Sequence, residues 1–191
     1  MIFHETSLQG AFVLEPEAAR DDRGYFTRVW CSDELAEHGL NSTWVQSSVS
    51  YNDKALTLRG MHYQVAPHEE AKLVRCTAGA VFDVIIDLRS DSATYGDWFS
   101  VDLSPDNNLT LYVPAGLAHG FLTTEDMSVV EYHMSEVYSS GLARGVRWDD
   151  PTIAIPWPAS PVLMSDRDRG LPTLDSLSPG PEDLSREGAQ S

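Results

Sequence analysis

The stretch that decides the fold is Gly79-Ala80-Val81-Phe82-Asp83-Val84-Ile85-Ile86-Asp87-Leu88, in the middle of the chain. In an extended segment successive side chains point to opposite faces, so Phe82, Val84, Ile86 and Leu88 share one face. The opposite face alternates aliphatic residues with Asp. This period of two predicts a β-strand, and we expect the face with Phe82 to belong to a hydrophobic core.

The segments that follow repeat this pattern. Residues 98–103 (Trp-Phe-Ser-Val-Asp-Leu) and 109–113 (Leu-Thr-Leu-Tyr-Val) also alternate, and residues 104–108 (Ser-Pro-Asp-Asn-Asn) between them are a turn signal that favours antiparallel pairing. Many short strands from Lys72 onward, without a regular alternation of strand and helix, predict an all-β sandwich or barrel of the jelly-roll kind with short peripheral helices.

The 191 residues suffice for one globular domain, because a chain of this size buries roughly 70% of its surface without disulfide or metal support. We expect this domain to span residues 1–170, with one helix at residues 32–39 that is capped by Ser32 and ended by Gly39. Residues 171–191 are rich in Ser, Pro, Gly and acidic residues, which predicts a flexible C-terminal tail.

The charge balance excludes several classes of partner. Lys and Arg number 13 against 29 Asp and Glu, and the net charge of −16 repels nucleic acid, so we expect no such partner. No stretch approaches the roughly 20 apolar residues of a membrane span, and the first residues are not a leader, so we expect a cytoplasmic protein without a membrane partner. Cys31 and Cys76 are far apart in the sequence and are expected to be core thiols.

Polar residues that could carry chemistry gather in four segments. These are residues 22–26 (Asp-Arg-Gly-Tyr-Phe), 58–64 (Leu-Arg-Gly-Met-His-Tyr-Gln), 114–121 (Pro-Ala-Gly-Leu-Ala-His-Gly-Phe) and 165–168 (Ser-Asp-Arg-Asp). A Pro-Ala-Gly turn that delivers His119 into an apolar context is typical of a barrel mouth. A single histidine in such a place is more often a hydrogen-bonded structural residue than a functional one, so the whole constellation must decide.

In this order the segments resemble the dTDP-4-dehydrorhamnose 3,5-epimerase family, whose fold is a cupin-type jelly roll. The resemblance covers most of the chain, and no single motif carries it alone. The matching segments are residues 22–24, 58–64, 72–75 (Lys-Leu-Val-Arg), 82–84 (Phe-Asp-Val), 114–121, 148–151 (Trp-Asp-Asp-Pro), 155–158 (Ile-Pro-Trp-Pro) and 165–168.

The segment from Pro114 to His119 is also the second half of the metal-binding cupin signature. The first half of that signature requires a His-x-His pair, whereas His62 is followed two positions later by Gln64, and Gln is a poor metal ligand. We therefore expect neither a bound metal nor any other cofactor.

The resemblance implies proton chemistry beside a ketone and assigns four catalytic residues. His62 corresponds to the base, and Asp168 to the carboxylate that orients it. Lys72 corresponds to the cation that faces the enolate oxygen, and Tyr132 to the acid that returns a proton from the opposite face. Judged from the sequence pattern alone, Tyr132 is instead a core aromatic residue of a strand.

The resemblance also implies a set of substrate-binding residues. Arg23 and Arg59 correspond to positions that grip the diphosphate of a nucleotide-sugar, and Phe26 and Tyr138 to positions near the nucleotide. Gln46, Ser48 and His119 complete the set. In the family the Arg-Gly-x-Phe segment crosses to the neighbouring subunit, which implies a homodimer.

The sequence departs from the family at the nucleotide side. Arg28 stands where the family usually has Glu, and Ser48 where it has Asn, so the identity of the base is open, with thymidine favoured. The expected function is a cofactor-independent epimerase of a nucleotide-linked 4-keto-6-deoxyhexose in deoxysugar biosynthesis, acting at C3, C5 or both. The alternatives are an enzyme that inverts one centre on a different nucleotide-sugar, and a non-catalytic cupin that binds such a sugar.

Overall fold

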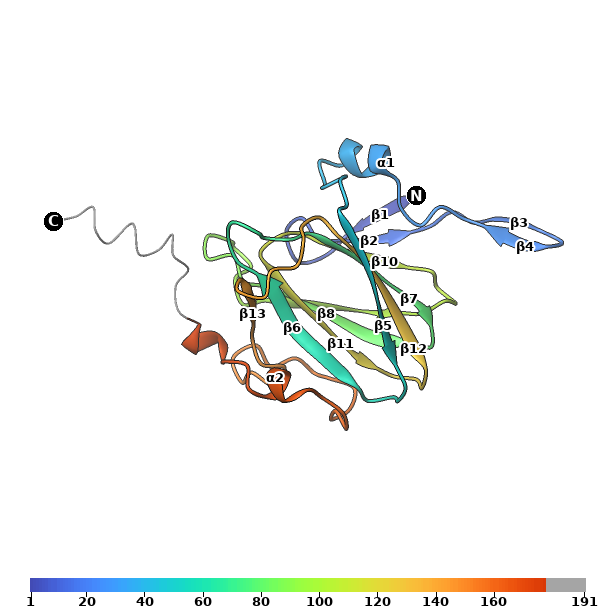
Figure 1. Cartoon of the computed structure of the whole chain (residues 1–191). Helices are drawn as coiled ribbons and strands as arrows, with labels where there is room; N and C mark the ends of the chain where they lie inside the picture. The colour runs from blue at the N-terminus through green and yellow to red at the C-terminus, as the bar shows by residue number, and fades with distance from the viewer. Residues whose placement is uncertain (178–191) are drawn as a thin grey trace.

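A computed structural model of the chain describes residues 1–177, and these fold mainly into β-strands (Figure 1). The strands are β1 (Ile2–Glu5), β2 (Phe12–Glu15), β3 (Ala19–Asp21), β4 (Gly24–Phe26), β5 (Gln46–Asn52), β6 (Leu58–Gln64), β7 (Lys72–Ala78), β8 (Val81–Asp87), β9 (Trp98–Leu103), β10 (Thr110–Val113), β11 (Leu117–Thr123), β12 (Ser128–Met134) and β13 (Ala143–Gly145). The helices are α1 (Ser32–Glu37), α2 (Asp166–Arg169) and the 3-10 turn η1 (Leu174–Ser176).

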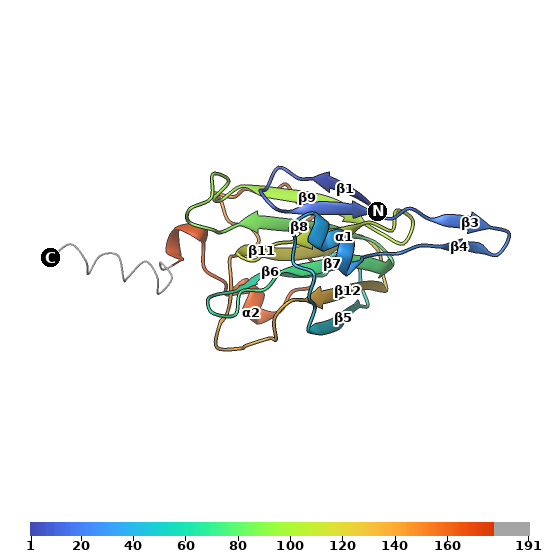
Figure 2. The ribbon, with the colours of Figure 1, turned by 90° about the horizontal axis from the view of Figure 1, so that it is seen from above.

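Two antiparallel sheets face each other and enclose the barrel (Figures 1 and 2). One has the strand order β1-β2-β10-β7-β12-β5, and the other has the order β13-β6-β11-β8-β9. Sequential neighbours such as β7 and β8 lie in different sheets, and this arrangement is a jelly roll. The predicted all-β jelly-roll class is confirmed.

Strand β8 is buried on both faces, and its two faces belong to two different cores. Val81 and Ile85 pack in the main core with residues of the other sheet such as Val74 and Val130, so their face lines the interior. The face with Phe82 does belong to a core, as expected, but this is a second core outside the barrel. The strand alone could not reveal which face would be inside, because a later segment covers the outer one.

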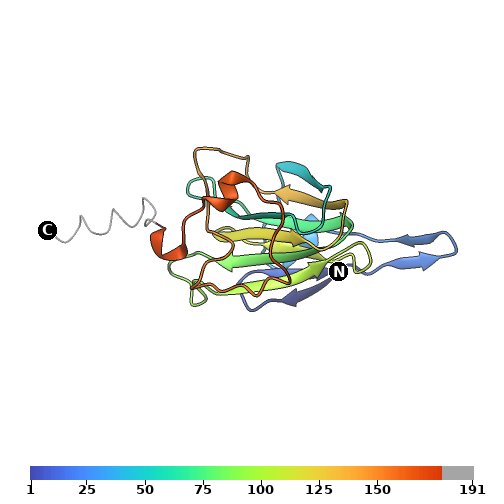
Figure 3. The ribbon, with the colours of Figure 1, turned by 90° about the horizontal axis from the view of Figure 1, so that it is seen from below.

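That later segment is the C-terminal layer, residues 146–177, which crosses the outer face of the sheet that contains β8 (Figure 3). Ile153, Trp157 and Leu174 pack there against residues of β8. Buried Asp150 fixes the layer, because its carboxylate accepts backbone N–H groups from Thr152, Ile153 and Leu174 at 2.7–3.0 Å. Of the predicted tail, Leu174 is buried and Leu177 packs against the same core, so the folded part extends beyond the expected boundary at 170. Residues 178–191 lie outside the described residues.

The predicted helix is present as α1, with one difference at its start. Ser32 is the first helical residue rather than the cap, and Cys31 occupies the cap position without a side-chain hydrogen bond. Gly39, at a φ of +69°, ends the helix as predicted. The core-thiol prediction holds for Cys76, which is buried, whereas Cys31 is only half-buried.

Strands β3 and β4 form a hairpin that projects from the barrel (Figures 1 and 2). All residues of both strands are exposed, and Phe26 at the end of β4 is 81% exposed. No helix within residues 1–177 is long and apolar enough to cross a membrane.

Candidate active site

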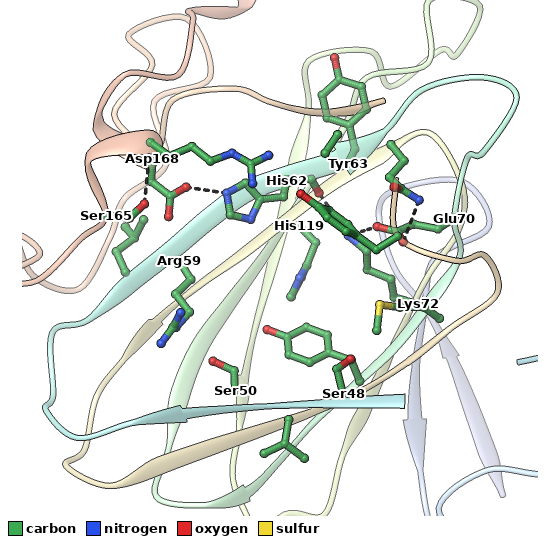
Figure 4. Close-up of a pocket in the computed structure, with 18 of the residues that line it drawn as sticks. Ser48, Ser50, Arg59, His62, Tyr63, Glu70, Lys72, His119, Ser165 and Asp168 are labelled. Carbon is green, nitrogen blue, oxygen red and sulfur yellow. Dashed lines mark hydrogen bonds and ion pairs between the residues drawn. The ribbon is translucent and has the colours of Figure 1, made fainter. Parts of the chain in front are cut away.

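A cavity of ≈ 640 Å³ lies between the two sheets and is closed on one side by α2 (Figure 4). Nine of the eleven predicted site residues line this cavity. They are Gln46, Ser48, Arg59, His62, Lys72, His119, Tyr132, Tyr138 and Asp168. Strands β5, β7 and β12 contribute from one sheet and β6 and β11 from the other, so residues far apart in sequence meet in one place.

His62 on β6 is paired with Asp168 on α2. The ring Nε2 lies 2.6 Å from Oδ1 of Asp168, whose side chain is only 6% exposed. The Ser165 hydroxyl caps α2 by accepting the backbone N–H of Asp168. This hydrogen bond fixes the backbone from which the Asp168 side chain extends. Burial raises the pKa of Asp168, but the hydrogen bond and charge of His62 outweigh it and hold the pKa below its ordinary value. When the ring is neutral, Nε2 carries the proton and Nδ1 keeps its lone pair, because an ionised carboxylate only accepts.

Two glycines let β6 and β11 approach closely beside this pair. A Cβ on Gly60 would lie 2.5 Å from Cα of Gly120, and Gly60 has a φ of +134°. A side chain at either position would force the strands apart. The close approach places His62 and His119 opposite each other as register partners on the cavity floor.

His119 is held by a carboxylate as well. Its Nε2 lies 2.9 Å from both oxygens of Asp83, which is fully buried on the inner face of β8. Burial raises the pKa of Asp83, although His119 and Lys72 oppose this. The Tyr132 ring lies edge-on to His119, with centroids 5.8 Å apart. Burial, and after it the charge of Asp83, raise the pKa of Tyr132 well above its ordinary value, so the phenol stays protonated.

Lys72 on β7 supplies a buried positive charge. Its Nζ lies 3.1 Å from Oε1 of Glu70 and donates to the backbone oxygen of His62 at 3.3 Å. The imidazole of His62, the phenol of Tyr132 and the ammonium of Lys72 therefore line one cavity. Such groups can transfer protons to and from a bound molecule and stabilise a negative charge that develops on it.

The remaining predicted cavity residues form two further groups. Arg59 donates its Nε–H to Oδ1 of Asn52 at 2.7 Å, which fixes the guanidinium at the cavity wall. Gln46 donates to the Ser48 hydroxyl and accepts the N–H of Tyr138, both at 3.3 Å. Three residues that were predicted separately are therefore linked.

Arg23 and Phe26 do not reach this cavity in the single chain. Both lie on the exposed hairpin, where the Arg23 side chain is 90% exposed and pairs with Asp21. Phe26 lines a smaller depression beside Arg28 and Glu34, at the base of the hairpin.

Sequence reasoning missed Asp83, Glu70 and Asn52, each of which holds a predicted residue in place. The sequence did contain a signal for Asp83, because an acidic residue between two aliphatic residues of the same strand face, Val81 and Ile85, needs a partner if that face is buried. The sequence contained no such signal for Glu70 and Asn52. Asn52 meets Arg59 only through the arrangement of β5 and β6, and Glu70 meets Lys72 only through the conformation of the loop before β7.

Gln64, at the position where the metal cupin signature has His, is committed to other partners. Its Nε2 donates to Oε2 of Glu70 at 3.3 Å and to the backbone oxygen of His68 at 3.0 Å. Its Oε1 accepts the N–H of Ser139 at 2.6 Å. The side chain therefore ties two loops together at the cavity.

Comparisons with known proteins identify the family of the chain. The family model described as dTDP-4-dehydrorhamnose 3,5-epimerase matches residues 5–176. A protein of that name from Sinorhizobium fredii is 41% identical over 182 residues, 93% of this chain and 91% of its own. The crystal structure of the Bacillus anthracis enzyme of that name, with TDP and PPi bound, is 43% identical, has a TM-score of 0.86, and covers 90% of this chain and 98% of its own.

A more specialised enzyme has the same fold. The structure of a 3′-monoepimerase from Streptomyces bikiniensis in complex with dTDP-quinovose is 32% identical, has a TM-score of 0.85, and covers 95% of this chain and 90% of its own. The cavity, the paired His62 and the matches over nearly the whole length lead to one conclusion: the chain is an isomerase that belongs to the dTDP-4-dehydrorhamnose 3,5-epimerase family.

Proposed function

We propose that the enzyme epimerises a dTDP-linked 4-keto-6-deoxyhexose at C3 and C5, without a cofactor, in deoxysugar biosynthesis. The observation that carries the proposal is the placement of His62 and Tyr132. They belong to opposing sheets and line the same cavity, so a sugar ring between them has a base on one face and an acid on the other. Inversion of a carbon requires this arrangement.

The first step is removal of a proton from the carbon next to the C4 ketone. The electron pair of the C–H bond moves into the ring to form the enolate, and the proton goes to Nδ1 of His62. Asp168, which is ionised at neutral pH, fixes the tautomer of His62 and stabilises the imidazolium that forms.

The second requirement is stabilisation of the enolate. Negative charge gathers on the C4 oxygen, and the proposal assigns the ammonium of Lys72, which lies in the buried wall, to face it. Because the charge is absent in the ketone, this interaction favours the intermediate over the substrate and raises the rate rather than the affinity.

Tyr132 then protonates the carbon from the opposite face. Its hydroxyl is protonated at every physiological pH because burial raises its pKa. The phenolate that remains must regain a proton from solvent, as His62 must lose one, before the next turnover. Arg59 is assigned to the diphosphate, and Gln46, Ser48, Tyr138 and His119 to the rest of the nucleotide-sugar.

We further propose a cytoplasmic homodimer in which the hairpin of one chain completes the site of the other. Its support is the exposure of Arg23 and Phe26, two residues assigned to substrate that lie outside the cavity of their own chain. Within a dimer the guanidinium of Arg23 joins that of Arg59 at the diphosphate, which offsets the acidic field of the protein.

The alternative function is inversion of one centre only. It is favoured by the likeness to the Streptomyces bikiniensis 3′-monoepimerase, since one fold accommodates both outcomes. The two functions differ in how many ring carbons lose a proton, not in which residues remove it.

The test is a deuterium wash-in assay in D₂O with dTDP-4-keto-6-deoxyglucose, followed by mass spectrometry. The proposal predicts two exchanged centres, and one exchanged centre would establish the alternative. His62→Ala should lower the exchange rate by roughly 10²–10⁴-fold, as expected for loss of a general base, with unchanged thermal unfolding. No exchange by the wild-type enzyme, combined with tight dTDP binding, would make it a non-catalytic binding protein.

A further inference from the structure

Lys72 has a buried partner that the mechanism above does not use. Lys72 and Glu70 form an ion pair of 3.1 Å in which both side chains are 8% exposed, and both line the cavity (Figure 4). A lone ammonium in such surroundings would be costly to desolvate and would withdraw toward water. The carboxylate of Glu70 offsets that cost and keeps the charge at the cavity wall.

The ammonium of Lys72 offers three N–H donors. One faces Oε1 of Glu70, and another donates to the backbone oxygen of His62 at 3.3 Å. These two interactions hold Nζ from two directions and leave one donor for a ligand. Glu70 thereby determines where the remaining donor points.

Glu70 is itself fixed from the other side. Its Oε2 accepts Nε2 of Gln64 at 3.3 Å, and Oε1 of Gln64 accepts the N–H of Ser139 at 2.6 Å. Ser139 follows Tyr138, which lines the cavity. A continuous set of contacts therefore runs from Lys72 through Glu70 and Gln64 to the loop that carries Tyr138.

We propose that Glu70 is a positioning residue for the epimerase reaction, which holds Lys72 against the C4 oxygen and ties it to the Tyr138 loop. The inference rests on the proposed function, because Lys72 needs a developing negative charge to act on. The proposed effect of Glu70 is not a stronger electrostatic stabilisation of the enolate, because a carboxylate beside the ammonium weakens the positive potential at the enolate oxygen. Glu70 therefore weakens the electrostatic potential of Lys72 at the enolate but holds its ammonium in a fixed position.

The variant that isolates this role is Glu70→Gln. The amide keeps the size of the side chain but loses the charge, and its NH₂ group meets the NH₂ group of Gln64, so the contacts no longer match. The rate of deuterium exchange at saturating substrate should fall roughly 10- to 100-fold, the range expected for loss of a charged hydrogen bond. KM should change less than about 3-fold, because the C4 oxygen becomes charged only after proton removal.

Glu69→Gln is the matched control, because Glu69 is the exposed neighbour and loses the same charge. It should exchange deuterium at the wild-type rate. A rise in exchange rate with Glu70→Gln, or a fall shared equally by both variants, would overturn the proposal.

A double-mutant cycle separates positioning of Lys72 from a merely structural role. Lys72→Met removes the group that Glu70 holds, so adding Glu70→Gln to Lys72→Met should cost less than about 2-fold further. The same 10- to 100-fold loss in both backgrounds would show that Glu70 acts on the fold and not through Lys72. If wild-type enzyme exchanges no deuterium, the proposed function fails; if it does and Glu70→Gln matches it, only this inference fails.

Discussion

Oδ1 of Asp168 lies 2.6 Å from Nε2 of His62, although 106 residues separate the two in the chain. His62 belongs to a barrel strand, whereas Asp168 belongs to a short helix of the C-terminal layer. The hydrogen bond that orients the proposed base therefore joins the barrel to the C-terminal layer.

Asp168→Asn should therefore disable the base while preserving the shape of the site. An amide that turns its NH₂ toward Nε2 moves the ring proton to Nδ1, the nitrogen that must accept the substrate proton. The deuterium exchange rate should fall by roughly 10²–10⁴-fold. Asp166→Asn, an exposed change on the same helix, should exchange normally, and equal losses in the two variants would point to damage to α2 instead.

Tyr132→Phe should separate exchange from inversion. The ring still packs, so the core keeps its volume, but the proton donor on the face opposite His62 is gone. His62 can still remove a proton and return a deuteron to the same face. Mass spectrometry should show deuterium uptake, while NMR of the sugar shows the starting configuration. Epimerisation at the wild-type rate would leave Tyr132 as a core aromatic residue only.

Activity should survive exhaustive treatment with a metal chelator. Gln64 stands where the metal cupin signature requires His, and both ends of its amide are used by Glu70 and Ser139. We expect an unchanged exchange rate after dialysis against EDTA. Loss of activity that returns with an added divalent metal, and not with buffer alone, would contradict this.

Asp87, at the end of β8, should stabilise the fold in a pH-dependent way. Burial raises its pKa, but hydrogen bonds from Arg89, Ser92 and Thr94 outweigh this and lower the pKa to about 2 from 3.8. A lowered pKa stabilises the protein above the unfolded-state value, and this contribution is lost as the pH falls from about 4 to about 2.

Asp87→Asn should accordingly lower the free energy of unfolding at pH 7 by about 2 kcal/mol, as measured by urea denaturation. The difference from wild type should shrink when the measurement is repeated near pH 3. Asp106→Asn, an exposed change in the β9–β10 turn, should have little effect at either pH. A difference that is independent of pH would trace to packing instead of charge.

The alternation in β8 was enough to predict a strand, because the period of two is a local property of the chain, and its repetition in the segments that follow predicted the all-β class. It did not predict that the face with Asp83 lines the barrel, since residues far later in sequence cover the other face. The extent of that layer was also underestimated, because Leu174 lies in a segment whose composition predicted a tail.

The candidate site was predictable where a motif carries the reacting group itself. His62, Lys72, Tyr132 and Asp168 were assigned from the family resemblance and line one cavity, whereas the sequence pattern alone predicted Tyr132 to be a core aromatic residue. Their supports were not predictable, because Glu70 meets its partner through a loop conformation. The catalytic and binding roles of all these residues remain predictions.

Asp168 belongs to the C-terminal layer, so the proposed base is prepared only while that layer is docked on the barrel. The layer is held on the barrel by side chains such as Ile153 and Leu174 and by backbone hydrogen bonds to β6. In β6, Met61 exchanges two of these bonds with Val146, and Leu58 donates its N–H to Leu163. No residue of the layer belongs to a strand of the two sheets. Peripheral segments of this kind open at a lower free energy than the whole protein unfolds. We therefore expect mild heat or denaturant to reduce the activity before the barrel unfolds, so that the outermost segment and not the core limits the working temperature range.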